Sequence, residues 1–321
     1  MYFGSIRFFR HLIFAMIFLP IIILTITVFI LLSKLNQTND TIEKLEKKIS
    51  RLSSRSEHLG EKKETESLSR NTTEEQKSNP LQSDDKVIVS NQNKVFDKFP
   101  LLSTVPATTI VNPDKTVYIT FDDGPSPLTT KILDTLKTQG IKATFFVVGE
   151  QIDKYPEILK RIVNEGHAVG IHSDTHQYEQ IYANLDAFLN DYDQTLIKIK
   201  AITNSPVTVY RLPGGSLNNY NKNIAGDIIK ELNFRGFTNF DWNVSAGDSS
   251  PNRLSSTEII SNIVSDAVSK NVGIVLMHDT DTMITTSESL VEVIRQLREM
   301  GFNFGVLTNE IKTIQFFKQK S

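Results

Sequence analysis

Short runs rich in strand-forming residues alternate with helical segments from residue 116 almost to the C-terminus. We expect seven strands, at 117–121, 143–148, 168–171, 207–210, 236–239, 273–277 and 303–307. We expect six helices, at 129–139, 156–165, 185–203, 222–232, 257–270 and 287–300. Such alternation is typical of parallel strands joined by helical crossovers. Seven strands in about 200 residues favour an α/β fold, a distorted or incomplete (β/α) barrel, with an open doubly wound sheet as the alternative.

Two carboxylates close the first expected strand. The sequence at 120–125 is Thr-Phe-Asp-Asp-Gly-Pro, so Asp122 and Asp123 come directly before a Gly-Pro turn. In barrels of this class the carboxyl ends of the strands carry the catalytic side chains. Adjacent carboxylates repel each other, so we expect a cation nearby that offsets their charge. A solvated turn at a strand end is the alternative, because Asp, Gly and Pro are common in turns.

Two histidines follow the third expected strand. His172 and His176 are four residues apart, which places both imidazoles on one face if the segment makes a helical turn. With one carboxylate they would form a facial ligand set that leaves positions open for water and substrate. Two surface histidines at a chance spacing are the alternative. His167 precedes the strand, and we interpret it as structural.

Three more polar clusters follow expected strands. Arg211 begins the sequence Arg-Leu-Pro-Gly-Gly-Ser, where a guanidinium would hold a catalytic carboxylate ionised and the turn would offer backbone N–H groups to an oxyanion. Asp241 precedes Trp242, the single Trp of the chain. Trp242 is either an ordinary packing residue or forms one wall of a sugar-binding pocket. His278 ends an apolar strand, where a buried His needs a polar partner. The five clusters together predict a metal-assisted hydrolase with a separate base and acid.

Composition excludes several other classes of function. The chain has 321 residues with 35 basic and 37 acidic side chains, and this balance gives no support for binding nucleic acid. It contains no Cys, which excludes disulfides, thiolate metal sites and Cys nucleophiles.

The N-terminal part predicts a membrane anchor. Residues 12–32 contain no charged side chain, and about 20 apolar residues suffice to span a bilayer. A cleavable signal peptide is the alternative, but its apolar region is usually about 7–15 residues and no Ala-x-Ala site follows here. Arg7 and Arg10 precede the span and favour a cytoplasmic N-terminus. We therefore expect residues 1–33 to be a cytoplasmic tip and single-pass anchor in the cell membrane, with the catalytic domain extracellular.

Residues 34–94 are expected to be a stalk and linker. An apolar heptad pattern from Leu35 to Leu59 predicts either a short coiled coil with weak dimerisation or a single solvated helix. Residues 53–94 are mostly polar and predict a disordered spacer. The third part, residues 95–321, holds every polar cluster described above.

In these clusters the sequence resembles the polysaccharide deacetylase family, also called the NodB-homology domain or carbohydrate esterase family 4. The resemblance covers roughly residues 114–310 and rests on five ordered motifs. These are Thr-Phe-Asp-Asp-Gly-Pro at 120–125, His-Ser-x-x-His at 172–176, Arg-x-Pro at 211–213, Asp-Trp at 241–242 and Leu-x-His at 276–278. Gly214 stands where many members carry a Tyr, so the packing around the acetyl group does not follow from the family pattern. Membrane-anchored bacterial enzymes of this type act on peptidoglycan N-acetylglucosamine.

The resemblance implies a role for each motif. Asp123, His172 and His176 would bind a divalent metal, most simply zinc, with cobalt or manganese as alternatives. Asp122 would be the general base, Arg211 would orient it, and His278 would protonate the leaving amine with support from Asp241. Substrate and oxyanion contacts would come from Pro213, Gly214, Trp242 and Leu276. The products would be acetate and a glucosamine residue in a cell-wall glycan.

Two alternatives stay open at this point. In the first alternative, the substrate is N-acetylmuramic acid, a chitin oligomer or an exopolysaccharide instead of N-acetylglucosamine in peptidoglycan. Or the domain is a catalytically inactive wall-binding module, against which the intact set of Asp and His residues argues.

Overall fold

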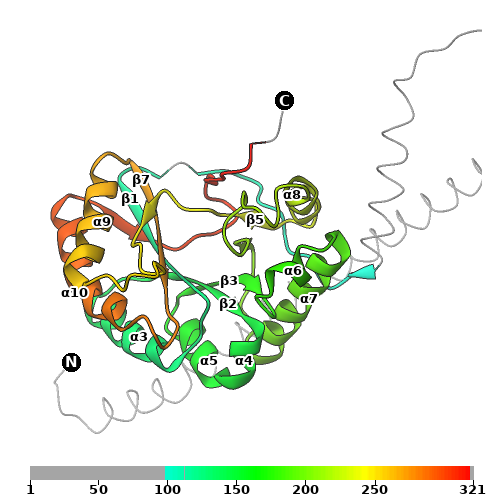
Figure 1. The fold of residues 1–321 in the computed structure, drawn as a ribbon, viewed down its shortest axis with the longest axis horizontal. Coiled ribbons are helices and arrows are strands. Elements are labelled where there is room, and N and C mark those ends of the chain that lie inside the picture. The colour runs from blue at the N-terminus through cyan, green and yellow to red at the C-terminus, as the bar shows by residue number, and fades with distance from the viewer. Residues whose placement is uncertain (1–97, 112, 319–321) are drawn as a thin grey trace, which may run out of the picture. The chain divides into compact units, whose positions relative to one another are not determined.

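The computed structural model describes residues 98–111 and 113–318 (Figure 1). The predicted anchor and stalk lie outside the described residues. Within the described ranges, no helix is both long and apolar enough to cross a membrane.

In the described part of the chain, eight strands form one sheet. Their order is β5-β4-β3-β2-β1-β7-β6, with β8 paired to the first half of β1, and every pairing is parallel. The strands are β1 (Thr116–Asp122), β2 (Thr144–Val148), β3 (Ala168–Ser173), β4 (Val209–Tyr210), β5 (Thr238–Asn239), β6 (Val244–Ser245), β7 (Val272–His278) and β8 (Asn303–Gly305). All seven residues of β1 are buried, as expected of a central parallel strand covered on both faces.

The sheet curls into an incomplete barrel. Its two edge strands, β5 and β6, are separated in the chain only by residues 240–243, so the ends of the strand order are drawn together. Figure 1 shows the helices around the outside of the strands. The prediction of a parallel, incomplete (β/α) barrel is confirmed in this form, and the seven expected strands are all present with shifted bounds. Strand β6 was not predicted.

The helices of the described residues are α3 (Pro127–Gln139), α4 (Gly149–Lys154), α5 (Pro156–Asn164), α6 (Tyr178–Ile181), α7 (Leu185–Ile202), α8 (Ala225–Phe234), α9 (Ser256–Val268) and α10 (Ile284–Glu299). Local sequence explains their ends. Helix α3 begins with a capping box between Ser126 and Thr129 and ends at Gly140, which has φ 66°. The six expected helices are found. Helices α4 and α6 were missed because they are too short for helical periodicity to show.

Two layers of apolar side chains fix which way each strand residue points. Val117, Ile119 and Phe121 belong to the larger cluster, which includes the buried residues of the outer helices. Tyr118 belongs to a smaller cluster with side chains such as Phe146 and Ile274, which fills the inside of the curl. Because side chains alternate along a strand, Thr120 and Asp122 share the inner face with Tyr118. The fold therefore delivers Asp122 to the inside of the barrel at its carboxyl end.

Candidate active site

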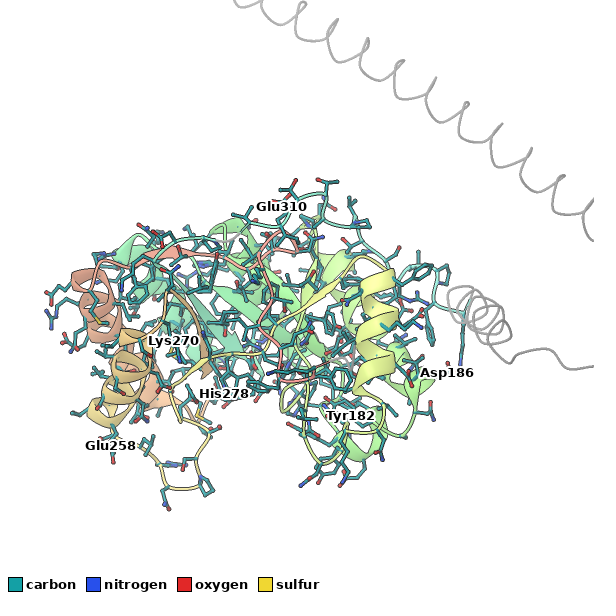
Figure 2. All side chains as sticks on the ribbon, turned by 90° about the horizontal axis from the view of Figure 1, so that it is seen from above. Tyr182, Asp186, Glu258, Lys270, His278 and Glu310 are labelled. Carbon is teal, nitrogen blue, oxygen red and sulfur yellow. The ribbon has the colours of Figure 1, made fainter. Side chains whose placement is uncertain are left out.

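The carboxyl ends of the strands bring the five predicted clusters to one end of the barrel. Asp122 at the end of β1 is in register with His278 at the end of β7. His172 lies near the end of β3, and Arg211 directly follows β4. In Figure 2, His278 and Tyr182 lie toward one side of the domain, and Glu310 lies on the opposite side.

One carboxylate and two imidazoles form a group that fits a metal ion. Asp123 Oδ1 is 3.3 Å from His172 Nε2 and 3.3 Å from His176 Nε2. One ligand atom from each residue lies within 4.8 Å of the others. The two histidines do not share a helical turn. His172 belongs to β3, and His176 lies in the following loop with φ 57°, which brings the ring centroids to 5.2 Å.

The surroundings of this group fit a divalent cation. Asp123 Oδ1 is buried and has no hydrogen-bond partner, so a bound cation would satisfy it. His172 Nδ1 lies 2.9 Å from the Arg211 carbonyl oxygen and therefore carries the donated hydrogen. This tautomer leaves the Nε2 lone pair facing Asp123, which is the usual arrangement behind a metal-binding His.

Charges within the group also favour an ionised Asp123. Burial alone would raise the pKa of the Asp123 carboxyl, but the nearby imidazoles of His172, His176 and His278 lower that pKa below its usual range. Burial is the largest influence on His176 and lowers the pKa of its imidazole, which favours the neutral form that can bind a metal.

Arg211 pairs with Asp122 inside the barrel. The Arg211 side chain is fully buried, and its Nη1 donates to Asp122 Oδ1 at 2.8 Å and to Thr120 Oγ1 at 2.7 Å. Its Nε donates to the Phe240 carbonyl at 2.8 Å, and the guanidinium lies 4.2 Å from the Phe146 ring centroid. The expected contact between Arg211 and a site carboxylate is therefore present.

Asp241 does not contact His278 as expected. Its Oδ1 accepts from the Ser216 backbone N–H at 2.8 Å, and its Oδ2 accepts from the Ser216 hydroxyl and from the Phe316 N–H. Asp241 thus ties the loop after β4 to the C-terminal segment. The expectation that it supports the His278 imidazolium is wrong.

Asp248 takes that place. His278 Nδ1 lies 2.8 Å from Asp248 Oδ1, and the His278 backbone N–H donates to Oδ2 at 2.8 Å. Thr286 also donates to Oδ2 at 2.9 Å. Sequence analysis missed Asp248 because it follows the two-residue strand β6, which was not predicted.

The Asp248 contact keeps His278 protonated. Burial lowers the pKa of His278, but the hydrogen bond and charge of Asp248 outweigh it and raise the pKa to about 9, against an ordinary value of 6.5. Since Nδ1 is engaged, Nε2 is the nitrogen that can give a proton to a substrate.

The remaining predicted residues shape the rim. The Pro213 carbonyl accepts from the Tyr182 hydroxyl at 2.8 Å, and Gly214 follows with φ 74°. Trp242 packs edge-on against Phe316 at a centroid distance of 4.9 Å. Leu276 is buried within β7.

A carboxylate that sequence analysis missed fixes the loop between the two histidines. Asp191 of α7 accepts four hydrogen bonds from this loop, from the Ser173 hydroxyl, the Asp174 N–H, and both the N–H and hydroxyl of Thr175. Ser173 Oγ in turn accepts from the His176 N–H at 2.8 Å. No sequence motif marks Asp191, because its role depends on how α7 packs against β3.

Comparison with known proteins identifies the family. The polysaccharide deacetylase family model matches residues 110–236. The putative polysaccharide deacetylase YheN of Bacillus subtilis is 33% identical over 197 residues, covering 60% of this chain and 67% of that protein. The chain belongs to the polysaccharide deacetylase family. It is accordingly a hydrolase that acts on amide bonds of N-acetylated polysaccharide.

Other members of this family match over similar spans. A peptidoglycan-N-acetylglucosamine deacetylase of Bacillus cereus is 29% identical over 66% of this chain and 77% of its own length. The catalytic domain of peptidoglycan N-acetylglucosamine deacetylase from Eubacterium rectale superposes with a TM-score of 0.63 at 34% identity, over 67% of this chain and 98% of that one. A Streptococcus mutans esterase of carbohydrate esterase family 4 gives 0.57 at 33% identity, over 65% and 92%.

The Asp191 hydrogen bonds predict weaker metal binding when they are lost. We expect Asp191→Ala to lower metal affinity about 10–100-fold, because the loop that places His176 loses its support. Asp193→Ala is the matched control, since Asp193 lies on the same helix outside this hydrogen-bond set. Titration of the metal-free protein with zinc, followed by calorimetry, measures both affinities. Equal affinities in the two variants would remove Asp191 from the support of the site.

The Asp248 contact predicts a shift in pH dependence. Activity that needs protonated His278 is lost as pH rises through the pKa of His278. Asp248→Asn removes the charge that raises this pKa, so the basic limb of kcat/KM against pH should move down by about 1–3 units. Asp266→Asn, which also removes an aspartate charge near β6, should leave the limb in place. An unchanged limb in Asp248→Asn would show that His278 does not set it.

Proposed function

We propose that the chain is a metal-dependent deacetylase that hydrolyses the N-acetyl group of peptidoglycan N-acetylglucosamine and releases acetate. The observation that carries the proposal is the Asp123, His172 and His176 group, with Asp122 adjacent to it in the chain and in register with His278 on the neighbouring strand. Zinc is the metal we propose, because one carboxylate and two imidazoles are frequent ligands of catalytic zinc. Cobalt and manganese are the alternatives.

The residues of the chain divide the chemistry between them. When bound, the metal polarises the acetamide carbonyl and makes water more acidic. Asp122, which is paired with Arg211, takes a proton from the attacking water, whose oxygen bonds to the carbonyl carbon. The backbone N–H of Gly214 stabilises the developing oxyanion. His278 then protonates the amine nitrogen as the carbon–nitrogen bond breaks.

The choice of peptidoglycan is supported by relatives whose names state that activity. The Bacillus cereus and Eubacterium rectale proteins are peptidoglycan N-acetylglucosamine deacetylases. We infer that this chain acts on the same wall glycan outside the cell, tethered by the apolar residues 12–32 and the following linker. Weak dimerisation through residues 34–59 stays a prediction.

Acetate release from purified peptidoglycan tests the proposal. We expect one acetate for each new free amine, loss of release with a chelator, and recovery with added zinc. Asp122→Asn should lower kcat by about 10²–10⁴-fold and keep the metal, because Asp123 is the ligand.

Three outcomes would contradict parts of the proposal. Acetate from chitin oligomers or another glycan, with none from peptidoglycan, would overturn the substrate. Full activity after complete removal of the metal would overturn metal dependence. Binding of wall glycan without any acetate release would make the domain an inactive binding module.

A further inference from the structure

Tyr178 has no role in the proposed chemistry, yet it lies between the two parts of the site that would hold the acyl group. It is the first residue of α6, in the segment that follows the histidine loop. Its ring packs edge-on against the His176 imidazole, with a centroid distance of 5.3 Å and an interplanar angle of 89°. One side of Tyr178 therefore contacts a residue of the metal group.

The other side of Tyr178 fills the space next to Gly214. A Cβ atom placed on Gly214 would lie 3.0 Å from Tyr178 Cε1 and 3.0 Å from Tyr178 Oη. Such contacts are tight for a Cβ atom, and the φ of 74° at this position also disfavours any L side chain. The space that a side chain at position 214 would enter is thus occupied by a ring from α6.

Tyr182 holds the Tyr178 ring in place, and Tyr220 covers its outer side. Tyr182, one turn along, packs against it at 5.9 Å, and the Tyr182 hydroxyl donates to the Pro213 carbonyl at 2.8 Å. Tyr220 packs on it from the solvent side at 5.2 Å and is itself half exposed. Because Tyr182 binds the loop that carries Gly214, the distance between ring and loop is fixed.

In the proposed reaction the acyl carbonyl lies between the metal group and the Gly214 N–H, and Tyr178 contacts His176 of the metal group and lies next to Gly214. We propose that Tyr178 is a specificity-determining residue whose ring closes the acyl pocket and limits the acyl chain to the two carbons of acetyl. This inference rests on the proposed function and deepens it. A propionyl or butyryl group would have to displace the ring.

Acyl-chain selectivity tests the proposal. The substrates are glucosamine oligomers carrying N-acetyl, N-propionyl or N-butyryl groups, and the measurement is kcat/KM for carboxylate release from each. A pocket typically discriminates one methylene by about 10–200-fold. For the native chain, kcat/KM should therefore be at least about tenfold lower for the N-propionyl than for the N-acetyl substrate. The ratio of two substrates on one preparation is independent of its metal content.

Variants at position 178 separate ring volume from the hydroxyl. Tyr178→Ala should reduce the acetyl-over-butyryl ratio about tenfold or more, because the pocket opens. Tyr178→Phe should keep the ratio within about twofold, since the ring remains. Tyr178→Leu, an intermediate volume, should give an intermediate ratio and replaces Tyr178→Ala if that variant does not fold. Tyr220→Ala is the control and should keep the native ratio, since Tyr220 touches only the outer side of the ring.

A second variant tests the shared space directly. Gly214→Ala should lower kcat/KM on the acetyl substrate, and part of that loss should be recovered in the double variant Gly214→Ala, Tyr178→Ala. Recovery is expected to be incomplete because the backbone strain at position 214 and the 3.0 Å contact of the new Cβ with Asn218 Nδ2 remain. Strictly additive losses would show that the two residues do not compete for one space.

The outcomes separate this inference from the proposed function. An active Tyr178→Ala or Tyr178→Leu variant with the native acyl preference overturns the role of Tyr178 and leaves the deacetylase intact. If Tyr178→Phe and Tyr178→Ala change the acetyl-over-butyryl ratio equally, the volume of the ring does not limit the length of the acyl chain. No carboxylate release by the native chain from any of the three substrates or from peptidoglycan contradicts the proposed function itself.

Discussion

The buried guanidinium of Arg211 is the interaction on which the rest of the site depends. It bonds Asp122 and Thr120 of β1 and the Phe240 and Asp241 carbonyls that follow β5, so it connects strands from distant parts of the sheet. Its own carbonyl accepts from His172 Nδ1 and from the Tyr192 hydroxyl. Removing one partner of a buried ion pair typically costs about 3–5 kcal/mol, because the other charge is left uncompensated. Arg211 thus forms an ion pair with the candidate base Asp122, and its carbonyl sets the tautomer of the candidate metal ligand His172.

The site separates two histidine environments that are needed for opposite tasks. Burial lowers the pKa of His176 and favours the lone pair that a metal requires. At His278, burial acts in the same direction, but the Asp248 carboxylate raises the pKa to about 9 and keeps a proton available. Different surroundings, with the same side chain, give a ligand on one side of Asp122 and an acid on the other. This arrangement is how a single fold supports both functions near neutral pH.

Much of this arrangement could be predicted from the sequence, because it depends on local patterns. Buried strands with Asp122, His172 or His278 at or next to their last residue mark the carboxyl edge of a parallel sheet, and that edge is where the structure places them. The partners of these residues could not be predicted. Asp241 and Asp248 both follow short strands, and only the curl of the sheet decides which of them contacts His278.

Short elements and tertiary contacts account for the other differences. The four-residue spacing of His172 and His176 suggested a helical turn, but a strand end followed by a left-handed residue brings the rings together equally well. Asp191 and Tyr178 act through contacts between elements, from α7 to the histidine loop and from α6 to Gly214. No periodicity or motif in the sequence encodes such contacts.

Anomalous diffraction at the zinc absorption edge, from crystals of the protein grown with zinc, tests the central claim most directly. The account predicts one strong peak about 2.0–2.2 Å from Asp123, His172 Nε2 and His176 Nε2, with Asp122 outside the ligand set and still bonded to Arg211. A peak bound by Asp122 or by His278, or zinc bound only elsewhere on the protein, would contradict it.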